Sequence, residues 1–230
     1  MIFTGDIHGD HTVFYERCFG SYDTERKNKY LLVAGDFGFV YRTAQDGLKY
    51  RYEREYLDFI AGLPYTVLFV DGNHENFDRL NSEFPTVTLL GGRAHKIRDN
   101  IFHLMRGEIY TIEEKRVFAM GGAASHDKEM RTEGRSWWRQ EMPSQQEYER
   151  ALENLSKCGN RVDIIITHTA PEQIIRAMGK VPYPDEAPMN RFLSEVADRV
   201  EFDKWFFGHW HTDKWVCGRF RAIYSDVCCV

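Results

Sequence analysis

The sequence predicts a mixed α/β fold with more than one layer of β-sheet, and a single domain over residues 1–230. In the first half, short apolar runs alternate with amphipathic segments, an order typical of β-α-β-α-β units and a parallel sheet. In the middle and last parts, turn residues alone separate the apolar runs, which indicates antiparallel hairpins. No internal repeat, low-complexity tract or Pro- and Ser-rich linker divides the chain.

Strands are expected where apolar, β-branched and aromatic residues form short runs bounded by turn residues. Glu113–Lys115 and Gly218-Arg219 are predicted to be the tight turns of two hairpins. The expected strands are, in chain order, Met1–Thr4, Tyr30–Ala34, Tyr65–Val70, Val87–Leu90, Phe102–Met105, Glu108–Ile112, Arg116–Met120, Asp163–Thr167, Trp205–Phe207, Trp215–Val216 and Phe220–Tyr224.

Helices are expected between these strands. Apolar side chains recur on one face of a helix over residues 44–61. These side chains are Leu48, Tyr52, Tyr56, Phe59 and Ile60. Ser144 and Glu147 match a capping box, which predicts a helix that begins there. Pro171 and Pro188 are predicted to lie in the first turns of two further helices.

The composition excludes several classes of protein. With 43% hydrophobic residues the chain can build a core, so disorder as a class is excluded. The longest mainly apolar runs, such as Tyr65–Val70, are far shorter than the ~20 residues of a membrane span. A net charge of −5 argues against bulk binding to nucleic acid or to anionic membranes, although a local basic patch stays compatible with it.

A cytoplasmic location is expected. The first strand runs directly into Gly5-Asp6, which leaves no room for the basic and apolar regions of a secretory signal. The cysteines are odd in number and include no C-x-x-C pair, so we expect reduced structural thiols rather than disulfides or a zinc site. They are Cys18, Cys158, Cys217, Cys228 and Cys229.

Polar side chains follow five of the expected strands, at the point where each strand ends. Ligands of α/β proteins bind outside the carboxyl ends of strands, so these side chains are candidates for one common site. A glycine precedes most of them, which allows a tight turn and a close approach of the backbone to a ligand. The five strand ends carry Gly5-Asp6-Ile7-His8, Gly35-Asp36, Asp71-Gly72-Asn73-His74-Glu75, His168 and Gly208-His209-Trp210-His211.

Asp, Asn and His without cysteine form a donor set that suits Mn²⁺, Fe, Zn²⁺ or Mg²⁺. The set is too large for one tetrahedral ion, but it suits two ions that share a bridging carboxylate. Two ions about 3.5–4 Å apart are a common device for phosphoryl hydrolysis. One such motif alone is weak evidence, because strands often end in polar residues, whereas all five in order predict a metal-dependent hydrolase.

These five motifs together resemble the signature of the calcineurin-like metallophosphoesterases. The signature is G-D-x-H-G, G-D, G-N-H-E, a lone His after a strand, and G-H-x-H, and its elements run here from residue 5 to residue 211. The resemblance implies two mixed β-sheets packed as a sandwich and flanked by helices, an α/β/β/α arrangement. It also implies a binuclear metal centre and a hydrolase that acts on phosphoric ester bonds.

The resemblance further implies a role for each matching residue. The first metal ion would be held by Asp6, His8 and His211. The second would be held by Asn73, His168 and His209, with Asp36 as the bridging, catalytically essential carboxylate. His74 would contact the phosphate and protonate the leaving group. The expected ions are divalent, Mn²⁺ or Fe first, with Zn²⁺, Ni²⁺ and Mg²⁺ as alternatives.

Two positions depart from the family pattern. After Asp36, the polar residue that often follows in the family is missing from Phe37-Gly38-Phe39. Asp71 precedes Gly72. In the protein serine/threonine phosphatase branch the corresponding motif is similar to R-G-N-H-E, and its Arg binds the phosphate. The chain therefore looks unlike that branch, and we do not expect protein phosphatase activity.

A sixth strand end, over residues 121–139, carries candidate substrate-binding residues. If its strand joins the same sheets, His126, Arg131 and Arg135 are placed to hold phosphate oxygens, and Trp137 and Trp138 to cover the cleft or stack on a base. The alternative is that the tryptophans pack and the basic residues form a solvated face. The segment resembles a pattern in uncharacterised bacterial and phage members of the family, which brings no known substrate.

The sequence therefore predicts a binuclear phosphoesterase that hydrolyses a small phosphomonoester, as a phosphatase does, or a phosphodiester, by means of a metal-bridging hydroxide. One alternative is a nuclease or a nucleotide phosphodiesterase that uses the tryptophans to bind bases. Another is a catalytically silent binding scaffold, which is disfavoured because such members generally lose metal ligands and every expected ligand is present here. The sequence does not distinguish monoesterase from diesterase, and it predicts no oligomeric state.

Overall fold

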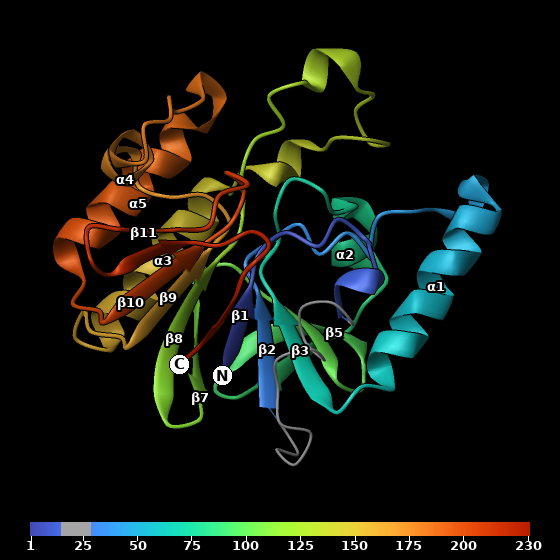
Figure 1. Cartoon of the computed structure of the whole chain (residues 1–230), viewed down its shortest axis with the longest axis horizontal. Helices are drawn as coiled ribbons and strands as arrows, with labels where there is room; N and C mark the ends of the chain where they lie inside the picture. Colours follow the sequence, from blue (N-terminus) through green and yellow to red (C-terminus); the bar gives the residue numbers. More distant parts are fainter. Residues whose placement is uncertain (15–28) are drawn as a thin grey trace.

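The computed structural model describes residues 1–14 and 29–230, and in this part of the chain two β-sheets lie between two sets of helices (Figure 1). The seven-stranded sheet of the described residues has the order β13-β1-β2-β3-β6-β5-β4. Its strands are β1 (Ile2–Thr4), β2 (Lys29–Val33), β3 (Tyr65–Phe69), β4 (Thr86–Leu89), β5 (Gly92–Arg98), β6 (Ile101–Leu104) and β13 (Val227–Cys229). β1, β2, β3 and β6 are parallel, and the remaining pairs are antiparallel.

The second sheet has six strands within the described residues, in the order β11-β12-β10-β9-β8-β7. Its strands are β7 (Glu108–Ile112), β8 (Lys115–Met120), β9 (Ile164–Thr167), β10 (Lys204–Phe207), β11 (Lys214–Val216) and β12 (Phe220–Ala222). Parallel pairing joins β8, β9, β10 and β12, and the β7–β8 and β11–β12 pairs are the two expected hairpins. Both sheets are thus mixed, as the resemblance implies.

Three buried apolar clusters correspond to the three layer contacts. Between the sheets, Phe3 of β1 stacks on Phe206 of β10 with ring centroids 4.0 Å apart. One outer cluster joins the seven-stranded sheet to the side of α1 (Leu48–Ala61) and α2 (Phe77–Ser82). The other joins the second sheet to three helices. These are α3 (Gln145–Lys157), α4 (Glu172–Ala177) and α5 (Ala187–Arg199). The layers are therefore α/β/β/α, and the predicted fold class is confirmed.

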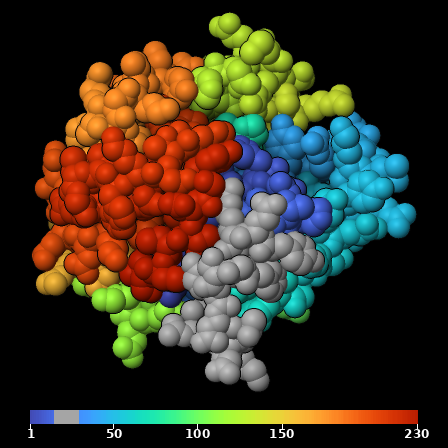
Figure 2. Space-filling view, in the orientation of Figure 1, coloured from blue at the N-terminus to red at the C-terminus, as the bar shows by residue number. Residues whose placement is uncertain are grey.

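The two ends of the chain lie side by side. β13 pairs with β1, and Figure 2 shows the red C-terminal surface against the blue N-terminal one. Within the described residues, no helix is both long and apolar enough to cross a lipid bilayer. Four cysteines are free thiols, and Cys18 lies outside the described residues. The free thiols are Cys158, Cys217, Cys228 and Cys229.

Some local details differ from the expectation. β5, β13 and α2 were not predicted, because they are short or rich in charged residues and show no clear alternation. The helix expected over 44–61 is broken at Gly47, whose φ of +57° separates a short 3₁₀ turn from α1. Pro171 precedes α4 as its N-cap residue instead of lying in its first turn. None of these differences moves the strand ends that carry the candidate ligands.

Candidate metal centre

The candidate ligands lie in loops that follow β1, β2, β3, β9 and β10, and the loops of the two sheets meet one another. Nδ1 of His168 lies 2.7 Å from the carbonyl oxygen of Ala34, which joins the loop after β9 to the loop after β2. The backbone N–H of His209 donates to Oδ1 of Asp6 at 3.1 Å, which joins the loop after β10 to the loop after β1. Residues that are far apart in the chain therefore converge at the junction of the sheets.

Glycine is required where these loops approach each other most closely. A Cβ atom at position 208 would lie 2.2 Å from Oδ1 of Asp6, and one at position 72 would lie 2.1 Å from Oδ1 of Asp36. Atoms cannot come so close without a shift of the backbone, so Gly208 and Gly72 admit the two carboxylates into the centre.

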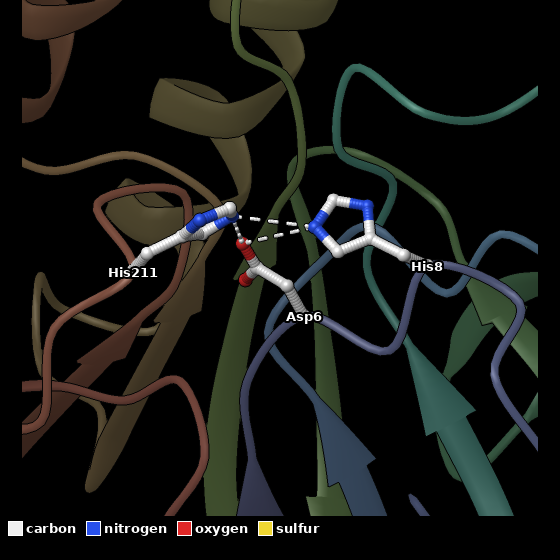
Figure 3. A group of neighbouring side chains, drawn as sticks. All are labelled: Asp6, His8 and His211. Atoms are coloured by element: carbon white, nitrogen blue, oxygen red, sulfur yellow. Dashed lines mark hydrogen bonds and ion pairs between the residues drawn. The ribbon is translucent and has the colours of Figure 1, made fainter. Parts of the chain in front are cut away.

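One ligand group is open to solvent. Asp6 and His8 from the loop after β1 and His211 from the loop after β10 converge in Figure 3. Oδ2 of Asp6 lies 3.2 Å from Nε2 of His211 and 3.8 Å from Nε2 of His8. The two Nε2 atoms are 3.3 Å apart. The side chains of His8 and His211 are 34% and 51% exposed, so a substrate can reach the centre from this side.

A second group, formed by Asp6, Asp36 and His168, is buried and shares Asp6 with the first, and Asp36 approaches residues of both groups. Asp36 has one carboxylate oxygen 3.7 Å from Nδ1 of His8 and the other 3.4 Å from Nε2 of His168. Asp36 thus forms one cluster of metal-ligand type with His8 and His74, and another with Asp6 and His168. A carboxylate placed between two clusters is suited to bridge two ions.

The orientation of the buried side chains fits a metal ion. The side-chain N–H of Asn73 donates to Oγ of Ser125 at 3.3 Å, and its buried Oδ1 has no hydrogen-bond partner in the described part of the chain. His168 is held through Nδ1, and its buried Nε2 makes no hydrogen bond within the described residues. Buried polar atoms are rarely left in this state, so these two are candidate ligand atoms. Together with the carboxylates they form a hard-to-borderline donor set.

Backbone conformation marks the same residues. His8, Asp36, His209 and His211 have φ values of +53°, +48°, +65° and +44°. Residues other than glycine are uncommon and mildly strained in this left-handed conformation, although Asn, Asp and His adopt it more often than the rest. Such strain clusters at functional sites, where the surrounding structure holds it in place.

The charges at the centre are strongly coupled. Burial by itself would lower the pKa of His168, but the adjacent Asp36 carboxylate outweighs it and raises that pKa to about 10. Burial would likewise raise the pKa of Asp36, yet the neighbouring histidines hold it well below its usual range. Positive charge beside the buried carboxylates therefore stabilises them, and a bound cation would supply such charge.

His74 lies beside this centre. Its backbone N–H donates to Oδ1 of Asp36 at 2.9 Å, and its ring lies edge-on to that of His8, with centroids 4.9 Å apart. Burial lowers the pKa of His74 to about 4. The carboxylate of Glu75 accepts from the backbone N–H groups of Phe37 and Gly72, each at 2.8 Å, and so ties the loops after β2 and β3 together.

Comparison with protein families agrees with this geometry. The model of the family described as calcineurin-like phosphoesterase matches residues 1–213 of the chain. The chain belongs to the calcineurin-like phosphoesterase family. This phosphoesterase is therefore a hydrolase of phosphoric ester bonds, and its family is metal-dependent, typically with two divalent ions. No curated protein matches the chain closely.

Two of the three candidate substrate residues of this phosphoesterase lie at the centre. The His126 ring is 6.2 Å from that of His209 and stacks on Tyr183 at 4.2 Å. Arg131 is close enough to His74 for its charge to help lower the pKa of that histidine. Arg135 is exposed and lies near Asp46, whose pKa is lowered mainly by the backbone N–H of Thr43 and slightly by the charge of Arg135.

The two tryptophans of this segment pack against the protein. Trp138 is 2% exposed, and its indole N–H donates to Oδ2 of Asp78 at 2.9 Å. Trp137 lies under the ammonium group of Lys128, 6.0 Å from the ring centroid. Burial favours the packing alternative for Trp138, whereas Trp137 is half-buried and lines a small cavity beside Lys128.

The structure adds a carboxylate that the sequence did not single out. Oε1 of the fully buried Glu186 lies 2.7 Å from Nε2 of His209, and Oε2 accepts from the hydroxyl of Thr169 at 3.0 Å. Glu186 precedes α5, where an acidic residue usually serves the end of a helix. No local pattern distinguishes it from such a residue, so only the fold reveals its contact.

Proposed function

We propose that this phosphoesterase hydrolyses phosphomonoesters or phosphodiesters with two divalent ions that share Asp36. The observation that carries the proposal is the position of Asp36 between an open and a buried ligand group. Asp6, His8 and His211 form the open group. Asn73, His168 and His209 supply the side chains of the buried group. Mn²⁺ or Fe suits these oxygen and nitrogen donors, and Zn²⁺, Ni²⁺ or Mg²⁺ remain alternatives for the assay.

Bound ions would supply a nucleophile at neutral pH and neutralise the charge of the phosphate. The chain itself positions the reactants. Asp6 and Asp36 are fixed by backbone N–H groups of His209 and His74, which keeps both carboxylates in one orientation. The His74 ring lies beside the open group, where it is placed to hold a phosphate oxygen or to pass a proton to the leaving oxygen.

The direct test is hydrolysis of a mono-aryl and a bis-aryl phosphate by protein loaded separately with Mn²⁺, Ni²⁺, Zn²⁺ and Mg²⁺. We expect hydrolysis that a chelator abolishes and that the active metal restores, with two equivalents of bound metal per chain. The ratio of the two rates assigns the protein as a monoesterase or a diesterase. If neither ester is hydrolysed in a chelator-sensitive way, the proposed function is wrong.

A further inference from the structure

A cavity of about 560 Å³ adjoins the candidate metal centre. Its inner wall includes His8 and His74, and its outer wall is formed by the chain from 38 to 42 and by one face of α1. It borders the segment 121–143 at Tyr41, whose ring lies 5.8 Å from that of Trp138. The hydroxyl of Tyr41 donates to the carbonyl oxygen of Ser136 at 3.3 Å, where the two segments meet.

Aromatic rings form most of the outer wall. Tyr52 and Tyr56 stand one helical turn apart on α1, with ring centroids 6.4 Å apart and planes inclined by 25°. Phe39 lies beneath them, edge-on to Tyr56 at 6.4 Å, and Tyr41 lies 6.4 Å from the ring of His74. Tyr52 is 47% exposed, so its ring is available to a ligand, whereas one face of Tyr56 is covered by the ring of His11, with centroids 4.0 Å apart.

The cavity also carries positive charge. Arg42 and Lys49 line it, and among the described residues neither forms an ion pair. Its one carboxylate, Glu53, is already occupied: Oε1 lies 2.6 Å from Nη1 of Arg79, and Oε2 accepts from the backbone N–H groups of Tyr41 and Arg42. An organic anion is therefore the kind of molecule that this surface attracts.

The position of His74 connects the cavity to the reaction. A phosphate at the metal centre whose leaving oxygen faces His74 directs the rest of its leaving group into the space that His74 lines. That space contains the rings of Tyr52 and Tyr56. Aromatic side chains bind planar rings by stacking and tolerate different ring types, because every such ring offers a π-face.

We propose that the preferred substrate is a phosphoester whose leaving group carries a planar aromatic ring, such as a nucleoside, and that this ring binds against Tyr52 and Tyr56. The inference rests on the proposed function for the position of the phosphate. It differs from stacking on the tryptophans, because Trp138 is buried and Trp137 lies under Lys128.

The test compares three esters of primary alcohols on the metal-loaded protein: adenosine 5′-monophosphate, uridine 5′-monophosphate and ribose 5-phosphate. All three release a comparable alkoxide, so differences in kcat/KM report binding of the ring. We expect both nucleotides to exceed ribose 5-phosphate by at least about tenfold, the usual scale of one stacked ring. Equal kcat/KM for the three esters would overturn the proposal while leaving the proposed function intact.

The variant Tyr52→Leu keeps an apolar side chain and removes the ring. We expect it to lose most of the preference for nucleotides and to keep the wild-type kcat/KM for ribose 5-phosphate. Leu48→Ala is the matched control, since Leu48 lies one turn earlier on α1, is 65% exposed and does not line the cavity. An equal loss in Leu48→Ala would contradict a role for the Tyr52 ring.

Equilibrium binding separates this proposal from the proposed function. Adenosine and uridine have no phosphate, and calorimetry measures their affinity for the metal-loaded protein without any reaction. We expect binding that weakens about tenfold in Tyr52→Leu. If no ester is hydrolysed but the nucleosides bind in this way, the proposed function fails and the ring site stands. If the wild-type protein binds neither nucleoside, the ring site is wrong.

Discussion

The loops that follow β1, β2, β3, β9 and β10 carry the candidate ligands and are termed the metal loops. They lie next to the segment 121–143, but the two regions differ in how many hydrogen-bond and ion-pair partners their polar side chains have. In the metal loops, buried atoms such as Oδ1 of Asn73 and Nε2 of His168 have no hydrogen-bond partner among the described residues, and several residues have left-handed backbones. In the segment 121–143, most charged side chains are paired within the protein. Arg131 pairs with Asp127 at 2.7 Å, and Lys128 pairs with Asp185.

The difference indicates whether the polar groups of each region bind a ligand or stabilise the protein surface. Unsatisfied, strained groups are retained where an ion or substrate completes them. Paired groups at the surface stabilise its conformation, and their removal has a small effect because water solvates the partner that is left. We therefore expect large functional effects from substitutions in the metal loops and small ones from substitutions in the segment 121–143.

The largest effect is expected for Asp36→Asn. Asn tolerates the φ of +48° and keeps an oxygen for the N–H of His74, so the fold should persist while the bridging charge is lost. We expect bound metal to fall from two equivalents to one or fewer and kcat to fall by at least about 10³-fold. Metal analysis and initial rates measure both.

Asp99→Asn serves as its control, because Asp99 is exposed and pairs with Lys96 at the surface. This variant should keep metal content and kcat. Full activity with two bound ions in Asp36→Asn would show that Asp36 does not bridge, and the contrast between the two regions would lose its main support.

The next effect is expected for His74→Ala. Loss of a group that assists proton transfer typically lowers the rate by about 10²–10⁴-fold, and here metal content should stay unchanged. The loss should be greater for an alkyl phosphate than for an aryl phosphate, since the alkoxide is the poorer leaving group. A wild-type kcat with the alkyl ester would refute the acid role.

A smaller effect is expected for Glu186→Gln, which tests a contact just behind the centre. Partners of metal-bound histidines typically contribute 10–100-fold to metal affinity. We expect one ion to bind more weakly by that factor, and excess metal to restore activity. Titration with metal measures the affinity, and Glu172→Gln is the control, because Glu172 pairs with Arg176 on an exposed helix surface. An unchanged affinity would limit Glu186 to a structural role.

The smallest effects belong to the segment 121–143, where two arginines offer a matched pair. Arg131→Ala should raise KM by about tenfold, because a charged hydrogen bond to a phosphate is of that scale and Arg131 acts on His74. Arg135→Ala should leave KM within about twofold, since Arg135 is exposed. If both variants keep the wild-type kcat/KM, this segment takes no part in binding through its arginines.

Much of the fold was predictable from local patterns. The hairpin turns at Glu113–Lys115 and Gly218-Arg219 and the capping box at Ser144 depend on neighbouring residues, and the structure confirms them. β13 was missed because its three residues become a strand only by pairing with β1 at the opposite end of the chain. Its stability comes from a distant partner, which no local pattern records.

The candidate site likewise contains residues that the sequence revealed and one contact that it did not. Asp6, His74 and His168 were recognisable because each follows a strand within a short motif, and the structure brings them together. The contact of Glu186 with His209 was not recognisable, since it depends on how the chain before α5 packs against the loop after β10.

The sequence by itself determined most of the order of strands and helices, all but β5, β13 and α2, together with the mixed α/β class and the identity of the candidate ligands. These follow from residue spacing and from residues beside strand ends. Only the tertiary structure decided which ligand atoms face one another, that Trp138 is buried, and that Tyr52 and Tyr56 border a cavity beside His74. These features arise from packing between segments far apart in the chain, which spacing along the sequence does not encode.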